Sequence, residues 1–287
     1  MTIPPAFRFF RILAFLLAAS APAQGNPASE ALATPRLYAL DCGTLKLDSM
    51  ALFEDTDEYA NTPGTMAVPC FLIRHPNGDL IWDTGLGDRL AQHKDGVAIA
   101  EGITARVPVT LQAQLQQLGL APEDIELVAF SHLHVDHTGN ASLFTKALYL
   151  LNRKDLDWAL GKPTPFGVDA ESLSFASTAK TQAIELDHDV FGDGSVRIMS
   201  TPGHTPGHQI LLLRLANTGT IILSGDLYHT RDNFRLVRIP AINHSRGETL
   251  ASFDRVERLI RKHGARLVIQ HAPEDFAELP KFSAYLD

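Results

Sequence analysis

The chain has 287 residues, of which 45% are hydrophobic and 20% are charged. These proportions are ordinary for a soluble globular enzyme with one large domain or two small ones. The formal net charge is −8 at pH 7, and an acidic surface disfavours nucleic acid as a partner. We therefore expect a folded protein with a sizeable core and no nucleic-acid partner.

The first 23 residues (1–23) have the residue order of an export signal peptide. Arg8 and Arg11 precede the apolar run 12–19, and small residues that end in Ala23 follow it, which predicts cleavage near Ala23. An uncleaved membrane anchor is the alternative, but the run is short for a bilayer span. Loss of two arginines and no acidic residue takes the formal charge from −8 to −10. We expect a periplasmic or secreted protein with no stable membrane insertion after signal cleavage.

Residues 24–35 are rich in Ala, Pro and Ser and are predicted to form a mobile leader, followed by one folded domain over 36–287. A short apolar run at 37–40 predicts the first strand. The stretch 48–65 carries apolar residues without a clear period, so we predict a long loop. Loops of that length in compact domains are usually functional or disordered. Its apolar residues indicate that it packs over another surface, such as that of a substrate.

A β-hairpin is predicted where the apolar runs 68–74 and 80–82 flank Asn77-Gly78. Asn-Gly between two apolar runs is a strong turn signal. The second run leads into Asp83, which in such a turn is more often a loop-fixing residue than a metal ligand.

The two cysteines of the sequence, Cys42 and Cys70, allow two interpretations. A disulfide fits an oxidising compartment, and a pair of buried thiols fits the sequence equally well. Neither cysteine lies near a predicted metal-ligand motif.

Four potential metal ligands, His132, His134, Asp136 and His137, fall within six positions. The short apolar run 126–130 before them predicts a buried strand, so the ligands lie where a strand ends. Because side chains alternate along a strand, His132 and His134 would point the same way. The following turn can direct the other two side chains toward a second point nearby. Imidazole and carboxylate are the usual zinc ligands, and we prefer a metal site to a polar loop with hydrogen-bonded histidines.

The other predicted elements repeat a similar order in two halves. Helices are predicted at 109–118 and 248–263, where apolar residues recur at helical spacing, and a helical turn at 155–160. Residues 161–183 are poorly patterned and form a second candidate lid beside the loop at 48–65. Short apolar runs predict the remaining strands at 147–151, 196–200, 209–215, 220–223 and 267–269.

Three more potential ligands, His204, Asp226 and His271, follow predicted strands. Alone, His204 reads as a residue of a Pro-Gly turn and Asp226 as a turn-capping residue. Together with the histidine-rich cluster they indicate a metal centre, since such a coincidence across segments is improbable. Two zinc ions about 3.5–4 Å apart need a shared ligand, and Asp226 supplies a carboxylate for that role. The pattern predicts two β-rich halves that face each other, with polar residues gathered along one rim.

These seven positions occur in the order of the metallo-β-lactamase superfamily motif, His-x-His-x-Asp-His followed by a later His, Asp and His. From about Leu37 to its end the chain resembles this family. The resemblance implies an α/β fold, an αββα sandwich with two facing sheets and helices outside, so that 36–287 would be a metallo-β-lactamase-fold hydrolase domain. It implies two divalent metal ions, with Zn²⁺ preferred and Co, Mn or Fe as alternatives. The implied ligands are His132, His134 and His204 for one ion, Asp136, His137 and His271 for the other, and Asp226 as the bridge.

Within the superfamily the chain most resembles the N-acyl homoserine lactone lactonases. Di-iron oxygen-reducing members carry Glu where this chain has His134, and β-lactamases generally carry Cys or Ser where it has Asp226. Nuclease members usually add an insert that clamps the nucleic acid, and neither such an insert nor a basic patch is visible in this sequence. Thioesterases of the glyoxalase II type normally add a basic C-terminal clamp, whereas 274–287 is mostly acidic and apolar here. The segments that carry the lactonase resemblance are Val68 to Arg74, Trp82 to Gly85 and Ser131 to His134, together with the apolar loop before them.

The resemblance implies a metal-dependent hydrolase that opens the lactone ring of N-acyl homoserine lactones, which is quorum quenching, by attack of a metal-bridging hydroxide. Asp136, Asp226 or water would protonate the departing alkoxide. Well-known members place a tyrosine three residues after the bridging aspartate to contact the lactone. Here Tyr228 is two residues on and His229 is three, so both are candidates for that contact. His208 and His244 are not needed by the motif and are expected to be surface or supporting residues.

Two alternatives stay open. One is an enzyme of the same fold that acts on another ester, a thioester or a β-lactam. The other is an exported binding protein that sequesters a ligand or metal without turnover. The partner is expected to be a small-molecule lactone or ester, and a homodimer is compatible with the sequence. Five side chains are predicted either to line an acyl-chain pocket or to belong to the plain core: Phe53, Tyr59, Met66, Phe166 and Phe175.

Overall fold

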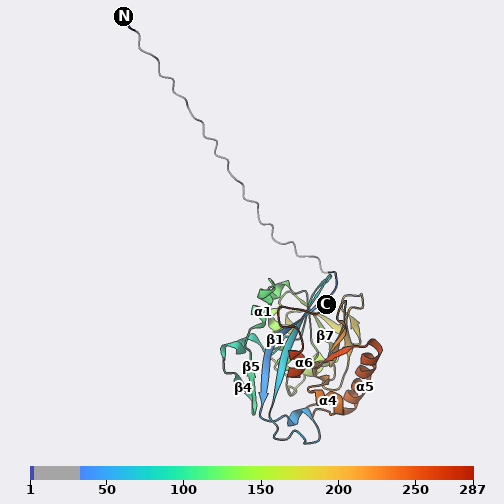
Figure 1. Ribbon diagram of the computed structural model, residues 1–287. Coiled ribbons are helices and arrows are strands. Elements are labelled where there is room, and N and C mark those ends of the chain that lie inside the picture. The colour runs from blue at the N-terminus through green and yellow to red at the C-terminus, as the bar shows by residue number, and fades with distance from the viewer. Residues whose placement is uncertain (3–32) are drawn as a thin grey trace. The chain divides into compact units, whose positions relative to one another are not determined.

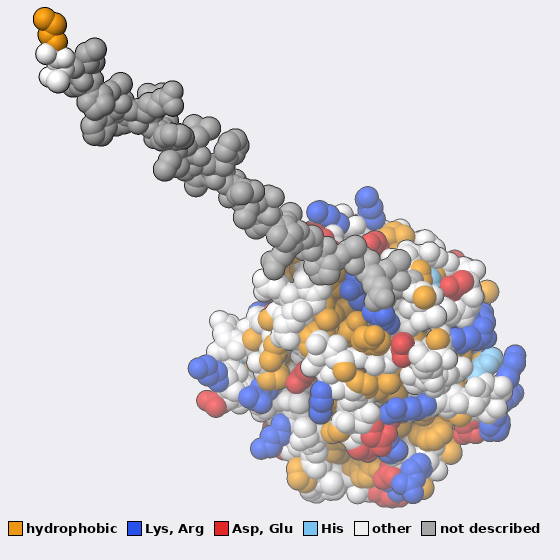
Figure 2. All heavy atoms as spheres, turned by 45° about the horizontal axis from the view of Figure 1, so that its top comes forward, with side chains coloured by type: hydrophobic (Ala, Val, Ile, Leu, Met, Phe, Trp, Pro, Cys, Tyr) orange, Lys and Arg blue, Asp and Glu red, His pale blue; other side chains and the backbone are white. Residues whose placement is uncertain are grey.

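The computed structural model describes residues 1–2 and 33–287 (Figure 1). The predicted signal peptide, and most of the predicted leader, lie outside the described residues. Within the part that is described, no helix combines the length and the apolar character needed to span a membrane. On the face drawn in Figure 2, basic and acidic side chains lie interspersed with apolar ones.

The first sheet has eight strands in the order β4-β5-β1-β2-β3-β6-β7-β8. The strands are β1 (Arg36–Leu47), β2 (Gly64–His75), β3 (Gly78–Trp82), β4 (Val97–Ala100), β5 (Ile103–Arg106), β6 (Leu127–Ala129), β7 (Leu148–Asn152) and β8 (Lys180–Ile184). The predicted hairpin is present, since β2 and β3 pair antiparallel and meet at His75 and Gly78. Strands β3, β6, β7 and β8 then pair in parallel, so the ends of β3 and β6 come out at the same edge.

The second sheet has five strands in the order β13-β12-β11-β10-β9. The strands are β9 (His188–Asp189), β10 (Val196–Ser200), β11 (Gln209–Leu215), β12 (Gly219–Leu223) and β13 (Arg266–Val268). Strands β12 and β13 pair in parallel, and a parallel pair needs a crossover connection. Helices α4 (Arg231–Leu236) and α5 (Arg246–His263) lie in that connection. The residues that follow β12 and β13 therefore emerge side by side.

The two sheets pack face to face, with helices on the outer faces (Figure 1). Phe71 and Trp82 of the first sheet share one buried cluster with Leu211 and Ile221 of the second. The helices of the first half are α1 (Leu111–Gln117), α2 (Val135–Thr138) and α3 (Arg153–Ala159), and α6 (Pro273–Ala277) follows β13. The apolar side of α1 and of α3 packs on the outer face of the first sheet, and that of α5 on the second. The predicted αββα sandwich is confirmed.

Local capping explains where α5 begins and ends. Ser245 accepts a hydrogen bond from the N–H of Glu248 at the first turn, and Gly264 adopts a left-handed conformation at the last. Such caps satisfy backbone groups that a helix leaves unpaired.

The 3₁₀ helix η1 (Ala51–Phe53) and the start of β2 lie within the stretch 48–65, which was predicted as one long loop.

Cys42 on β1 and Cys70 on β2 form a disulfide, which decides between the two interpretations of the cysteines. Both side chains are buried, and they lie beside the point where the register of β1 and β2 shifts, between Asp41 and Thr44. The Asp83-Thr84-Gly85 turn packs onto the disulfide, because a Cβ at Gly85 would lie 2.3 Å from Cys42 Cβ.

Replacing both cysteines with alanine is expected to lower the free energy of unfolding by about 3.5 kcal/mol. The disulfide closes a loop between residues 28 apart in sequence, and a loop of that size restricts the unfolded chain by roughly this amount. Urea denaturation of the oxidised parent and the double variant measures the difference. Equal midpoints, or two free thiols in the unreduced denatured parent, would contradict the assignment.

Candidate metal centre

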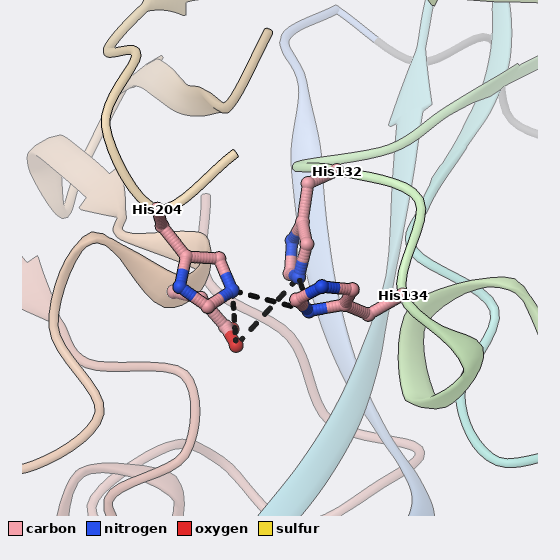
Figure 3. A group of neighbouring side chains, drawn as sticks. His132, His134 and His204 are labelled. Atoms are coloured by element: carbon pink, nitrogen blue, oxygen red, sulfur yellow. Dashed lines mark hydrogen bonds and ion pairs between the residues drawn. The ribbon is translucent and has the colours of Figure 1, made fainter. Parts of the chain in front are cut away.

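The first ligand group consists of His132, His134 and His204 (Figure 3). His134 Nδ1 lies 2.9 Å from His132 Nε2 and 3.1 Å from His204 Nε2. His204 approaches from the loop between β10 and β11, opposite the loop between β6 and α2 that carries the other two (Figure 3). Zn–N bonds of about 2.0–2.1 Å place the corners of a tetrahedron roughly 3.4 Å apart. The three nitrogens are therefore spaced as ligands of one cation.

The second ligand group consists of Asp136, His137 and His271. Asp136 Oδ2 lies 3.8 Å from His137 Nε2 and 3.5 Å from His271 Nε2. Asp136 and His137 belong to α2, while His271 follows β13 at the neighbouring sheet edge. Like the first group, the second therefore combines donors from both sheets.

Asp226 lies between the two groups and offers one carboxylate oxygen to each. Its Oδ1 is 3.1 Å from His137 Nε2 and 3.0 Å from His271 Nε2. Its Oδ2 is 3.7 Å from His132 Nε2 and 3.5 Å from His204 Nε2. In the described part of the chain, His137 Nε2 and Asp226 Oδ1 are buried without a hydrogen-bond partner. Buried polar atoms normally have partners, so two cations fit this donor set.

Asp83 fixes the loop that carries His132, His134, Asp136 and His137. Its Oδ1 accepts a hydrogen bond from the Ser131 N–H at 2.7 Å, and its Oδ2 accepts from Gln270 Nε2 at 2.6 Å. Oδ2 also lies 2.9 Å from His137 Nδ1. A proton held on Nδ1 by a carboxylate leaves Nε2 free to bind a metal. Asp83 is thus a loop-fixing residue, as its turn position indicated.

Backbone groups orient two further histidines. His271 Nδ1 donates to the Ala67 carbonyl of β2 at 2.6 Å, which turns Nε2 toward Asp226. His208 is not a member of either ligand group. Its Nε2 accepts a hydrogen bond from the Asp226 N–H at 3.0 Å, and its Nδ1 lies 3.1 Å from the Thr201 carbonyl. His208 is therefore buried support for the bridging residue.

The pKa values of the histidines are shifted in different directions in the two ligand groups. Burial lowers the pKa of His132 and His204 well below the ordinary value, and lowers that of His134 to about 4. Burial also acts to lower the pKa of His137, but the carboxylates of Asp226, Asp83 and Asp136 raise it well above that value. Metal ligands must be deprotonated imidazoles. The first group is therefore neutral and ready to bind near neutral pH.

Burial disfavours the ionised form of Asp226, but the surrounding histidines, led by His271 and His137, hold its pKa well below the ordinary value. The bridging carboxylate is therefore ionised at neutral pH, as a metal ligand must be.

A cavity of about 530 Å³ leads to the centre. Asp136, Asp226, His229 and His271 are among the residues that line it, and its other lining is mainly apolar. Both predicted lids contribute to it, Phe53 from the stretch 48–65 and Phe166 from 161–183. Ligand cavities are commonly apolar with a few polar groups that fix orientation.

Three of the five side chains predicted for an acyl-chain pocket line this cavity, namely Phe53, Met66 and Phe166. The other two do not belong to its lining. Tyr59 donates a hydrogen bond to Asp232 at 2.8 Å, and Phe175 packs in the core against Tyr149 and Phe130.

Tyr228 and His229, the two candidates for contact with a substrate, point in different directions. The Tyr228 ring packs in the core against Phe253 and Phe234. Its hydroxyl is buried, with no hydrogen-bond partner among the residues described. The buried His229 ring lines the cavity, and its Nε2 lies 3.0 Å from Asp226 Oδ2. His229 therefore faces the cavity, and Tyr228 faces the core.

Gly167 packs directly on His134, so replacing it with alanine should disturb the first ligand group. Its φ is +78°, and a Cβ there would lie 2.7 Å from His134 Cδ2. We expect zinc affinity to fall by about tenfold, as for other changes that move a ligand. Competition with a chromophoric chelator measures it.

Gly192 is a matched control for this change. It has φ +79°, and within the described residues nothing lies within 4 Å of where its Cβ would be. Gly192→Ala should show only the strain of a left-handed residue, about 1–2 kcal/mol of stability, with unchanged zinc affinity. Equal zinc affinities for both variants would contradict the role given to Gly167.

A family model described as the metallo-beta-lactamase superfamily matches residues 63–271. The N-acyl homoserine lactonase AttM of Azorhizobium caulinodans is 30% identical over 261 residues, covering 88% of this chain and 98% of that protein. A crystal structure of a mutant of the Bacillus thuringiensis lactonase AiiA, with N-decanoyl-L-homoserine bound at its active site, is 25% identical with a TM-score of 0.75. It covers 87% of this chain and 98% of that one. A structure of an N-acyl homoserine lactone hydrolase, with the product N-hexanoyl-L-homoserine at its catalytic metal centre, gives 25% identity and a TM-score of 0.74. The shares covered are again 87% and 98%.

Proposed function

Because the chain belongs to the metallo-β-lactamase superfamily, we propose that it is a metal-dependent hydrolase that opens the lactone ring of N-acyl homoserine lactones. One geometric feature carries the proposal. The carboxylate of Asp226, placed between two ligand groups, lines a mainly apolar cavity. A reactive polar group with an apolar approach suits a substrate with a hydrolysable head and an acyl tail. The names of the lactonase relatives agree with this assignment.

Two divalent ions bound by these residues would supply a nucleophile at neutral pH and polarise the substrate carbonyl. The protein's own side chains hold and orient the reactants. Asp136 is the member of the two ligand groups that is not fully buried, and it lines the cavity. Its carboxylate would accept the proton that the attacking oxygen loses and pass it to the departing alkoxide oxygen. A ring N–H of His229 can donate a hydrogen bond to a carbonyl oxygen of the substrate.

We propose zinc as the metal. Five imidazoles and two carboxylates are donors that zinc accepts, and related divalent ions accept them too. Chelation followed by addition of Zn, Co, Mn or Fe separates these candidates by the rate each one restores.

A side-by-side rate panel on the metal-loaded protein tests the function. The kcat/KM for N-hexanoyl homoserine lactone should be at least about 100-fold higher than that for a glutathione thioester or for the β-lactam nitrocefin. The reason is that a site whose polar groups fit one scissile group discriminates against the others. Longer acyl chains should raise kcat/KM about fourfold for each methylene that the cavity buries, at about 0.8 kcal/mol each. Faster turnover of the thioester or of nitrocefin would instead support another hydrolase of this fold. Zinc binding without turnover of any of the three would support a binding protein.

We also infer that the protein is exported to the periplasm or secreted. The residue order of 1–23 supports this, and so does the buried disulfide, because disulfides persist mainly in oxidising compartments. Cell fractionation combined with mass spectrometry of the N-terminus tests it. A cytosolic protein that retains Met1 would refute the inference.

A further inference from the structure

Two buried carboxylates outside the ligand set bind backbone N–H groups beside the metal ligands. They are Asp155 in α3 and Asp275 in α6. Their exposed fractions are only 1% and 3%. Burial of a carboxylate is costly unless it is hydrogen-bonded, so the partners of each one indicate what it does.

Asp155 joins the two loops that carry the first ligand group. Its Oδ2 accepts a hydrogen bond from the Leu133 N–H at 2.9 Å, and its Oδ1 accepts from the Gly207 N–H at 3.0 Å. Leu133 lies between His132 and His134, and Gly207 lies three residues after His204. One side chain thus fixes the distance between loops that come from different sheets.

The contact with Gly207 is close. A Cβ at Gly207 would lie 2.6 Å from the backbone nitrogen of Asp155 and 2.3 Å from Asn152 Oδ1. Both partners of the Asp155 carboxylate are N–H donors, so two acceptor oxygens are required. An asparagine in this position would point its side-chain NH₂ group at one of these two backbone N–H donors. Burial raises the pKa of Asp155 to about 6, which shows that the fold holds a carboxyl group where burial disfavours its charge.

Asp275 makes the corresponding contacts beside the second ligand group. Its Oδ2 accepts from the Ile269 N–H at 2.8 Å, two residues before His271. Its Oδ1 accepts from Arg231 Nε at 2.5 Å. Arg231 begins α4, two residues after His229. Asp275 thus ties the turn that delivers His271 to the segment that follows Asp226.

We propose that Asp155 and Asp275 are positioning residues, each of which sets the affinity of one metal ion. Asp155 governs the ion of the first ligand group, and Asp275 governs the ion of the second. This rests on the dinuclear metal centre of the proposed function and is independent of which substrate is hydrolysed. Partners that orient metal ligands typically change metal affinity by about 10- to 100-fold when they are replaced.

Two variants that each keep one intact ligand group serve as backgrounds in which the two ions can be studied separately. His271→Ala leaves the first group intact, and His204→Ala leaves the second. Asp155→Asn and Asp275→Asn are introduced into each background, and zinc affinity is measured by competition with a chromophoric chelator. Asp155→Asn should weaken zinc binding by about 10- to 100-fold in the first background and by less than about threefold in the second. Asp275→Asn should show the reverse.

Asp79→Asn is the matched control. Asp79 is also a buried carboxylate, 6% exposed, and it accepts a hydrogen bond from Arg74 Nε on β2. It contacts neither loop of the first group nor the His271 turn through any hydrogen bond within residues 33–287. It should leave zinc affinity unchanged in both backgrounds. Urea midpoints of the metal-free proteins show whether a variant has only lost stability.

Equal losses in both backgrounds, or no loss in either, would overturn the proposal. If Asp155→Asn does not fold, Gly207→Ala replaces it, because it separates the loop from α3 while both carboxylate oxygens remain. It should give the same selective loss. Failure of both backgrounds to bind zinc would overturn the metal centre itself. Selective loss by Asp155→Asn in the first background and by Asp275→Asn in the second, in a protein that does not hydrolyse lactones, would support the positioning roles. It would refute only the proposed substrate.

Discussion

Replacement of Asp226 by alanine is expected to lower kcat/KM for lactone hydrolysis by about 1,000-fold or more. The two carboxylate oxygens of Asp226 face different ligand groups at 3.0–3.7 Å. Without them, each ion keeps only three protein donors, and the carboxylate that lies between the two cations and offsets their repulsion is lost. Metal ions contribute several kcal/mol of transition-state stabilisation, and each 1.36 kcal/mol is about a tenfold change in rate.

Metal content and rate together test this prediction. Elemental analysis should show fewer than two ions per chain in Asp226→Ala. Asp254→Ala is the control, since Asp254 is exposed on α5 and, among the residues that the structure describes, forms an ion pair only with Arg258 one helical turn away. Exposed pairs of this kind contribute about 0–1 kcal/mol, so the control should keep both ions and its full rate. Two ions and an unchanged rate in Asp226→Ala would refute the bridging role.

Replacement of His229 by phenylalanine is expected to leave both ions bound and to lower kcat/KM by about 100-fold. The imidazole lines the cavity with its Nε2 3.0 Å from Asp226 Oδ2, and neither ring nitrogen makes a hydrogen bond in the described part of the chain. With Asp226 bound to the ions, a ring N–H of His229 would be available to a substrate. Loss of one donor to a reacting carbonyl typically costs this much. Phenylalanine keeps the ring that packs against Phe53 at 4.8 Å and removes only the polar atoms.

Tyr228→Phe is the matched control for His229→Phe. The Tyr228 hydroxyl is buried in the core without a partner within residues 33–287, so its removal should change neither rate nor metal content. Stability should not fall, because a buried unpaired hydroxyl carries a desolvation cost. A large loss of rate in Tyr228→Phe together with a normal rate in His229→Phe would reverse the assignment.

The metal ligands could be predicted because their chemistry is visible in short stretches of sequence. The cluster from His132 to His137 places four donors after an apolar strand, and strand ends place donors at a sheet edge. The structure brings all seven predicted ligands together. Tyr228 and His229 could not be separated in the same way. Adjacent residues in extended backbone point to opposite sides, and Tyr228 is extended, but nothing in the sequence says which side is the core.

Other features depend on contacts between distant parts of the chain. Asp83 and Gln270 are hydrogen-bonded across 187 positions of sequence, and no local pattern reveals that pairing. The strands β4 and β5 were not predicted, since β4 is largely exposed and lacks alternation. The first strand was predicted at 37–40 but extends to Leu47. The register shift after Asp41 interrupts the apolar pattern that would have marked its full length.

The origin of the ligands has a consequence for the stability of the whole sandwich. One sheet supplies His132, His134, Asp136 and His137 at the end of β6, and the other supplies His204, Asp226 and His271. Bound cations would therefore act as cross-links between the layers, and their binding energy would appear as folding energy. The free energy of unfolding should rise with the logarithm of free zinc, by about 4 kcal/mol at 1,000 times the Kd. Scarcity of zinc would then loosen the sandwich as well as stop catalysis.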